Sequence, residues 1–202
     1  PAGELMAMLR PFVYRKYLDY GAIDALRELQ QSIRREVARQ QLHNNIKRSA
    51  GGIRDAEFTA QALQIIRGGR ERQLQTAQLS TALAELAGAA IFTQQEVDSL
   101  WTGYQFLRHS EHAIQAINDR QTQQLPSEPL DQLRVAVLTG CLDWPSYLAA
   151  LAEQRSAVSA LFDSLFAASE QPEPEQGSEL WPLRGDRDEL QAPLQQALAD
   201  SG

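Results

Sequence analysis

Residues 47–58, KRSAGGIRDAEF, contain residue types that could bind phosphates and a metal ion. The paired glycines Gly51 and Gly52 stand before two acids, Asp55 and Glu57, which are separated by one alanine. If this run forms a β-strand, both carboxylates project from one face, and carboxylate oxygens are the ligands that divalent cations prefer. An ordinary surface strand with salt bridges accounts for the same pattern, so both interpretations stay open on these residues alone.

Three basic residues accompany the acids, namely Lys47, Arg48 and Arg54. They could contact a phosphate, or they could simply neutralise the two carboxylates. A glycine-rich phosphate loop requires a Lys-Ser or Lys-Thr pair after its glycines. The run IRGGRER, residues 66–72, lacks that pair, so we interpret its glycines as the end of a helix.

Other side chains with chemical potential form weaker patterns. His109 and His112 are three residues apart, whereas a zinc-binding helix places its two histidines four apart. No serine lies in a glycine elbow of the hydrolase type. Cys141 is the single cysteine, which rules out an internal disulfide and fits a reducing, cytoplasmic setting. We expect it to pack as a small apolar residue.

The composition favours a mainly helical protein without a membrane span. Of the 202 residues, 43% are apolar, which is enough for a sizeable core, and Ala, Leu and Gln are abundant. No apolar run approaches the roughly 18 residues that cross a bilayer. Residues 1–75 carry 13 Lys and Arg against 8 Asp and Glu, whereas the remainder carries 6 against 18. The acidic remainder argues against a nucleic-acid partner, and the basic part could face phosphates or form a solvated helix face.

Hydrophobic periodicity predicts a succession of helices interrupted by one short two-stranded piece. The helices are expected over residues 4–17, 22–40, 59–67, 76–88, 93–118, 129–139, 143–168 and 186–199. The strands are expected over residues 44–49 and 52–58, joined by the glycine turn. The run SEQPEPEQGSE, residues 169–179, predicts a linker because it has little capacity to pack.

Two details of the expected helix 93–118 can be tested by structure. Thr93 and Glu96 have the spacing of a capping box, which predicts the start of the helix. Glu111 lies on an otherwise apolar stripe of this helix. That position predicts either a place at the rim of the stripe or a structural ion pair.

Four runs within residues 5–170 resemble, in order and with compatible spacing, the glutamine synthetase adenylyltransferase family, also called adenylyl-removing enzymes. The runs are LRPFVYRKYLDYGAIDALRELQQSIRREV, NNIKRSAGGIRDAEFTAQALQIIRGGRE, YQFLRHSEHAIQAINDRQTQQLP and DWPSYLAALAEQRSAVSALF. The resemblance implies a mainly α chain in three parts. Residues 1–72 would be the C-terminal remnant of a nucleotidyltransferase α+β domain, 73–170 an all-helical bundle, and 171–202 a linker with the start of a further helix. The order of these parts resembles the N-terminal, deadenylylating half of such enzymes.

The same resemblance implies a chemistry for the glycine segment. Enzymes of this type hold two Mg²⁺ ions with three carboxylates, and Glu57 would be the third of them, with Asp55 beside it as a further catalytic residue. The resemblance places Lys47, Gly51, Gly52 and Arg54 near the phosphates of ATP or ADP. The implied reaction is phosphorolysis, in which phosphate attacks AMP-tyrosine on glutamine synthetase. The implied partners are glutamine synthetase and the PII signal protein.

This sequence departs from the family pattern in ways that limit the activity expected of the chain. The family's other two carboxylates form an Asp-x-Asp pair after a glycine turn, and residues 1–57 contain none. We therefore expect the isolated chain to be inactive. The family has Leu-Gly where this sequence has Arg48-Ser49, and bulky aliphatic residues where it has Thr59-Ala60. An alternative function is a non-catalytic helical module, residues 73–170, that docks PII or glutamine synthetase.

Overall fold

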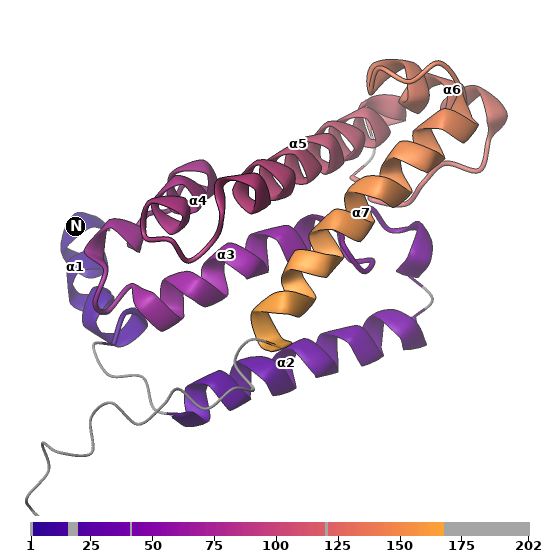
Figure 1. The fold of residues 1–202 in the computed structure, drawn as a ribbon. Coiled ribbons are helices and arrows are strands. Elements are labelled where there is room, and N and C mark those ends of the chain that lie inside the picture. Colours follow the sequence, from indigo (N-terminus) through magenta and orange to yellow (C-terminus); the bar gives the residue numbers. More distant parts are fainter. Residues whose placement is uncertain (1, 16–19, 41, 120, 168–202) are drawn as a thin grey trace, which may run out of the picture. The chain divides into compact units, whose positions relative to one another are not determined.

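A computed structural model describes residues 2–15, 20–40, 42–119 and 121–167, and over these ranges the chain is helical (Figure 1). The α-helices in these ranges are α1 (Ala2–Val13), α2 (Tyr20–Arg39), α3 (Ile53–Arg67), α4 (Leu79–Gly88), α5 (Gln94–Ala116), α6 (Pro129–Leu138) and α7 (Trp144–Ala167). Short 3₁₀ turns lie at Leu42–Asn44, Arg72–Leu74 and Ile117–Asp119. The mainly helical class is therefore confirmed. The expected linker and the expected helix 186–199 lie outside the described residues, and the domain boundary near residue 72 stays a prediction.

The expected strands 44–49 and 52–58 are wrong. Asn45 forms an isolated bridge with Gln124, and the chain then turns until α3 begins at Ile53. The helix forms because its apolar side chains recur at helical spacing, and those of Ile53, Ala56 and Ala60 are fully buried. Period-two alternation over the short run IRDAEF also fits a strand, so this run by itself could not separate the two structures.

Helix α5 packs against α3, α4, α6 and α7 and is most closely associated with α7. Leu100 and Leu107 on α5 are completely buried. At Gly103 the two helices approach closely, since a Cβ atom built there would lie 2.9 Å from Cγ2 of Val158 on α7. The glycine therefore sets the separation of the two helices at their crossing.

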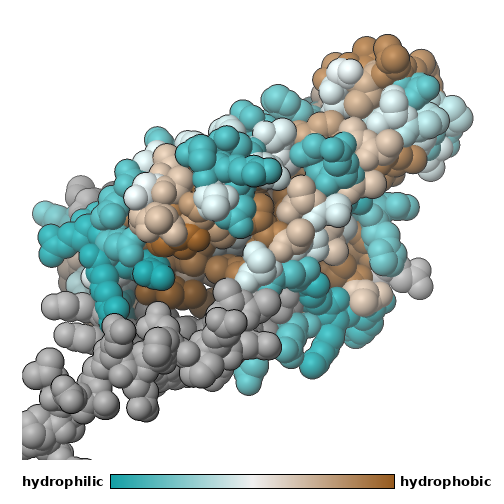
Figure 2. Space-filling model, viewed as in Figure 1, coloured by the Kyte–Doolittle hydropathy of each residue, from teal (hydrophilic) through white to brown (hydrophobic). Residues whose placement is uncertain are grey.

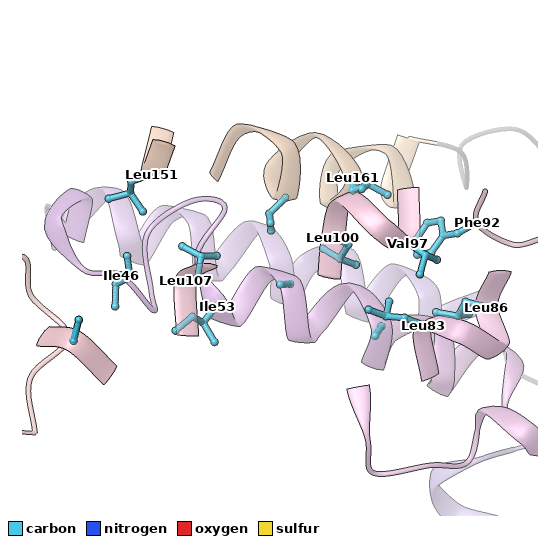
Figure 3. Close-up of a cluster of buried hydrophobic side chains, with 14 of the residues drawn as sticks. Ile46, Ile53, Leu83, Leu86, Phe92, Val97, Leu100, Leu107, Leu151 and Leu161 are labelled. Atoms are coloured by element: carbon cyan, nitrogen blue, oxygen red, sulfur yellow. The ribbon is translucent and has the colours of Figure 1, made fainter. Parts of the chain in front are cut away.

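One continuous apolar core extends along α3, between α5 and α7 (Figure 3). In the close-up, Ile46 and Ile53 lie near Leu107 and Leu151 towards one end of this core. The other end holds side chains of α4, α5 and the segment between them: Leu83, Leu86, Phe92, Val97 and Leu100. The residues that lead into α3 are thus anchored in the same core as the long helices.

The start of α5 matches its expected capping box. The amide of Glu96 donates to Oγ1 of Thr93 at 3.2 Å, and the amide of Thr93 donates to Oε2 of Glu96 at 2.7 Å. These bonds satisfy two of the amide groups that a helix start leaves without partners in its own hydrogen-bonding pattern. The prediction from Thr93 and Glu96 is confirmed.

Helix α2 is joined to α7 through Arg34. Its guanidinium group forms an ion pair with Asp163 and lies 5.4 Å from the centre of the Phe162 ring. A cation over an aromatic face is attracted by the negative charge of the ring face. Electrostatic contacts therefore contribute to the attachment of this helix.

Candidate functional site

The segment with the candidate chemistry folds as a turn, residues 45–52, followed by the first two turns of α3. We call residues 45–52 the glycine loop. Carbonyl groups of the loop accept amides both of the loop and of the first turn of α3, since Gly52 donates to the Ser49 carbonyl at 2.9 Å and Arg54 donates to the Lys47 carbonyl at 3.1 Å. The start of α3 is thus capped by backbone carbonyls of the preceding loop rather than by a side chain.

Both glycines of the loop stand where no side chain fits. Gly51 has a φ of +67°, and a Cβ atom there would lie 2.0 Å from the carbonyl oxygen of Arg155. A Cβ atom at Gly52 would lie 2.7 Å from the carbonyl oxygen of Lys47 and 2.8 Å from that of Ser49. Glycine is required at both positions because neighbouring backbone occupies the space of a side chain.

Asn45 shapes the first half of the loop. Its Oδ1 accepts hydrogen bonds from the amides of Lys47, at 3.1 Å, and Arg48, at 2.8 Å. This is the local side-chain to backbone bonding by which Asn favours turns. The same residue is bridged to Gln124, so the loop is also tied to the segment that follows α5.

Asp55 closes the loop from the helix side. Its Oδ2 accepts the amide of Gly51 at 2.8 Å, and the residue is buried. Burial raises the pKa of the Asp55 carboxyl, the Gly51 amide and Arg34 oppose the rise in pKa, and Asp163 adds to it. The structure therefore gives Asp55 a role in holding the loop.

Glu57 points to a different side of α3. Tyr104 of α5 donates its hydroxyl to Oε1 of Glu57 at 3.3 Å. The pKa of Tyr104 is raised, first by burial and then by the negative charge of Glu57. The expectation that Asp55 and Glu57 share one face is wrong, because residues two apart on a helix point in nearly opposite directions. Their catalytic roles stay predictions.

The basic residues of the segment lie nearer the surface. Arg54 is exposed, and Lys47 and Arg48 are half-buried. The Arg54 amide donates to the Lys47 carbonyl, and the charge of Arg54 opposes the rise in the pKa of Asp55 that burial causes. The contacts with nucleotide phosphates expected for Lys47, Gly51, Gly52 and Arg54 stay predictions.

Glu111, the acid on the apolar stripe of α5, is a structural ion pair. It is 3% exposed, and its Oε2 accepts from Nη1 of Arg108 at 2.6 Å. A buried carboxylate is costly unless it is paired, and Arg108 supplies the pairing cation. The predicted alternative of a structural pair is confirmed, and this carboxylate is not presented to a partner. Cys141 packs as expected, partly buried against the core.

Sequence reasoning missed two residues of this region, Tyr104 and Arg155. Both lie far along the chain from this region and contact it from long helices, Tyr104 at Glu57 on α3 and Arg155 at the carbonyl groups of His43 and Asn45. Arg155 stands on the face of α7 between the buried residues Leu151 and Val158, and that placement was a usable signal. The residues that its side chain contacts, however, could not be predicted from local sequence, because they lie more than 100 positions away.

In the part of the chain that the structure describes, no three His, Cys, Asp or Glu side chains gather where a metal ion could be held. Of the two acids of the segment, Asp55 accepts a hydrogen bond from the loop and Glu57 accepts one from Tyr104 of α5. No helix within the described ranges has the length and apolar character needed to cross a bilayer.

A second surface lies at α6. Leu130, Leu133, Val137 and Leu138 are all exposed, and a cavity of about 490 Å³ lies between α6 and residues Ala116 and Ile117. Figure 2 shows apolar side chains gathered over the region where α6 lies. Exposed apolar surface of this kind is typical of an interaction site.

Comparison with known proteins identifies relatives of this segment. A family model described as GlnD PII-uridylyltransferase matches residues 27–166. A bifunctional glutamine synthetase adenylyltransferase/adenylyl-removing enzyme of Pseudomonas syringae pv. tomato is 50% identical over 164 residues, 81% of this chain and 17% of the relative. The enzyme of the same description from Pseudomonas putida is 45% identical over 204 residues, 96% of this chain and 21% of the relative. The chain thus spans about a fifth of the length of these relatives.

Proposed function

The chain belongs to the family that the GlnD PII-uridylyltransferase model describes and to the glutamine synthetase adenylyltransferase/adenylyl-removing enzymes, and from this we propose that it is a segment of an enzyme that adds and removes AMP on glutamine synthetase. The observation that carries this proposal is the identity of 45–50% to such enzymes over most of the chain. The order of the glycine segment, the helices and the linker-like run favours the deadenylylating half.

In the proposed reaction, an oxygen of inorganic phosphate attacks the phosphorus of AMP-tyrosine. The bond between that phosphorus and the tyrosine oxygen breaks, ADP leaves, and the tyrosine hydroxyl recovers a proton. Bound Mg²⁺ would polarise the phosphoryl group. Glu57 would supply one carboxylate ligand, and the remaining ligands would come from outside the described residues. Arg54 and Lys47 would attract the phosphate electrostatically.

The structure supports distinct roles for the two acids. Glu57 is half-buried, and the hydroxyl of Tyr104 restrains its carboxylate. A single donor leaves the carboxylate further lone pairs with which to bind a cation. Asp55 is occupied by the Gly51 amide, so we propose that it supports the glycine loop while Glu57 takes part in chemistry.

A direct test compares Glu57→Ala with the exposed control Glu153→Ala in the longer enzyme in which we propose this segment to lie. The measurement is phosphate-dependent release of ADP from adenylylated glutamine synthetase. We expect Glu57→Ala to slow release by roughly 100-fold, the scale of losing one electrostatic group at a reacting centre. ATP-dependent attachment of AMP should be unchanged, and the 202-residue chain alone should release no ADP. Normal release by a folded Glu57→Ala enzyme would remove Glu57 from the reaction.

A second candidate function is a docking module for PII or glutamine synthetase formed by residues 73–170. It is favoured by the exposed apolar side chains and the cavity at α6, since interaction surfaces combine such features. Leu133→Asp should abolish binding of either protein to the chain, whereas Leu29→Asp, at an exposed apolar position on α2, should not. The absence of binding at micromolar concentrations by the unmodified chain would exclude this candidate.

A further inference from the structure

The guanidinium group of Arg155 reaches from α7 to the backbone that leads into the glycine loop. Its Nη1 donates to the carbonyl oxygen of His43 at 3.1 Å, and its Nη2 donates to that of Asn45 at 3.2 Å. These residues are more than 100 positions away in the sequence. Burial lowers the pKa of this guanidinium group, and such a cost is offset when its donors find acceptors.

The backbone of Arg155 touches the other end of the same loop. Its carbonyl oxygen, carbonyl carbon and Cα are the three atoms nearest to a Cβ built on Gly51. One residue of α7 therefore contacts the loop at both ends, through its side chain at Asn45 and through its backbone at Gly51. The position of the loop relative to α7 is defined by this pair of contacts.

The hydrogen bonds of Asn45 connect Arg155 to further residues of the loop. While Arg155 binds the Asn45 carbonyl, the Asn45 side chain binds the amides of Lys47 and Arg48. On the other side, Ile46 donates to the carbonyl of Gln123 at 2.8 Å. Hydrogen bonds thus connect the loop both to α7 and to the segment after α5. On the α7 side the donors are the charged N–H groups of Arg155.

We propose that Arg155 is a positioning residue that holds the glycine loop in the conformation from which α3 and Glu57 are presented. An arginine suits the task because its planar fork serves two carbonyl groups at once, whereas a lysine ammonium is a single point of charge. The claim that this positioning serves phosphoryl transfer rests on the proposed function. The contacts between Arg155 and the loop are observed in the structure and do not depend on that function.

Hydrogen exchange of the 202-residue chain tests the positioning role. In Arg155→Ala, amides of residues 45–52 should exchange at least about tenfold faster, the scale of losing hydrogen bonds from a charged donor. Amides of α4 should keep their rates, and the control Arg134→Ala, at an exposed ion pair with Asp131, should leave the loop unchanged. Unchanged loop exchange in Arg155→Ala, or an equal increase throughout the chain, would overturn the proposal.

Chemical rescue separates positioning from a general loss of stability. Ethylguanidinium at millimolar concentration should restore slow exchange in Arg155→Ala, whereas ethylammonium should not, because only the former has the forked donors. A destabilised fold would not recover with a guanidinium salt. If Arg155→Ala does not fold, Arg155→Lys replaces it, with faster loop exchange expected and wild-type exchange counting against the proposal.

The catalytic consequence is read separately in the longer enzyme. Arg155→Ala should lower phosphorolysis, and ethylguanidinium should restore it, whereas Glu57→Ala should not respond. If Glu57→Ala is fully active, the proposed function fails while the exchange result still decides the role of Arg155. If Arg155→Ala has a mobile loop and full activity, its role in positioning the reaction is refuted.

Discussion

At the scale of single residues, Asp55 shows how a candidate catalytic acid can have a structural role. Its carboxylate accepts the Gly51 amide within a buried environment near Arg34 and Asp163. Burial is the largest influence and raises its pKa above the ordinary value. The folded protein therefore binds a proton at Asp55 more tightly than the unfolded chain does.

The raised pKa of Asp55 predicts a pH effect on stability. The favourable contribution of protonated Asp55 is fully present below its ordinary pKa of 3.8 and is lost as pH rises through the higher folded value. Asp55→Asn, which stays neutral, should remove this loss. Urea unfolding should therefore show the variant gaining stability relative to wild type as pH rises from about 4 to 7. The exposed control Asp98→Asn should show no such trend, and a pH-independent difference for Asp55→Asn would contradict the prediction.

Two glycines with positive φ allow a matched comparison. Gly51→Ala combines an unfavourable backbone angle with a clash against the Arg155 backbone, whereas Gly140, with φ +83°, has open space around it. We expect Gly140→Ala to cost about 1 kcal/mol of unfolding free energy and Gly51→Ala to cost roughly 3 kcal/mol or more. Chemical denaturation measures both values. Equal losses would show that the loop moves away from α7 at little cost.

At the scale of elements, helix ends and helix crossings carry specific interactions. The start of α5 is held by the reciprocal bonds of Thr93 and Glu96, and its middle approaches α7 through Gly103. The capping bonds therefore define where α5 begins, and Gly103 sets the distance between α5 and α7. Helix α3 depends instead on backbone bonds with the glycine loop for its start.

The capping box predicts a measurable loss at a surface position. Thr93→Ala should lower the unfolding free energy by about 1 kcal/mol, because the helix start loses the acceptor for the Glu96 amide. Thr102→Ala is a matched control on an exposed position inside the same helix, where alanine should stabilise by a few tenths of a kcal/mol. Thermal or urea unfolding distinguishes the two. A loss at Thr102 as large as that at Thr93 would refute the capping explanation.

At the scale of the whole described chain, one core joins the glycine segment to the helices that follow it. Ile46 and Ile53 belong to the same buried cluster as Leu107, Val135 and Leu151. A change in the long helices should therefore be transmitted to the glycine loop. Hydrogen bonds add to this connection, since Arg155 and Tyr104 each donate to the segment from another helix.

A core substitution tests that continuity. Leu107→Ala should lower the unfolding free energy by about 3 kcal/mol, because a fully buried leucine leaves a cavity when truncated. Leu142→Ala, at a side chain that is 92% exposed, should change it by less than about 0.5 kcal/mol. Helical circular dichroism and exchange of the loop amides should report the same transition. Separate transitions would show that the glycine segment unfolds independently.

The sequence alone determined the features that depend on local order. Helical periodicity, the capping box at Thr93 and a turn at Gly51 depend on neighbouring residues, and each could be predicted without a structure, although the strands expected on either side of that turn were wrong. The ion pair of Glu111 was one of two alternatives that its position on an apolar stripe allowed. The resemblance to glutamine synthetase adenylyltransferases likewise rests on the order of residues.

Tertiary structure decided what depends on distant partners. The run IRDAEF alternates over too few residues to separate strand from helix, and burial of Ile53 and Ala56 in the shared core selects the helix. That choice turned Asp55 towards the loop and Glu57 towards Tyr104. Arg155 joins the loop only because α7 folds back across more than 100 residues of chain. Contacts of that span are set by packing of the helices, which local sequence patterns do not encode.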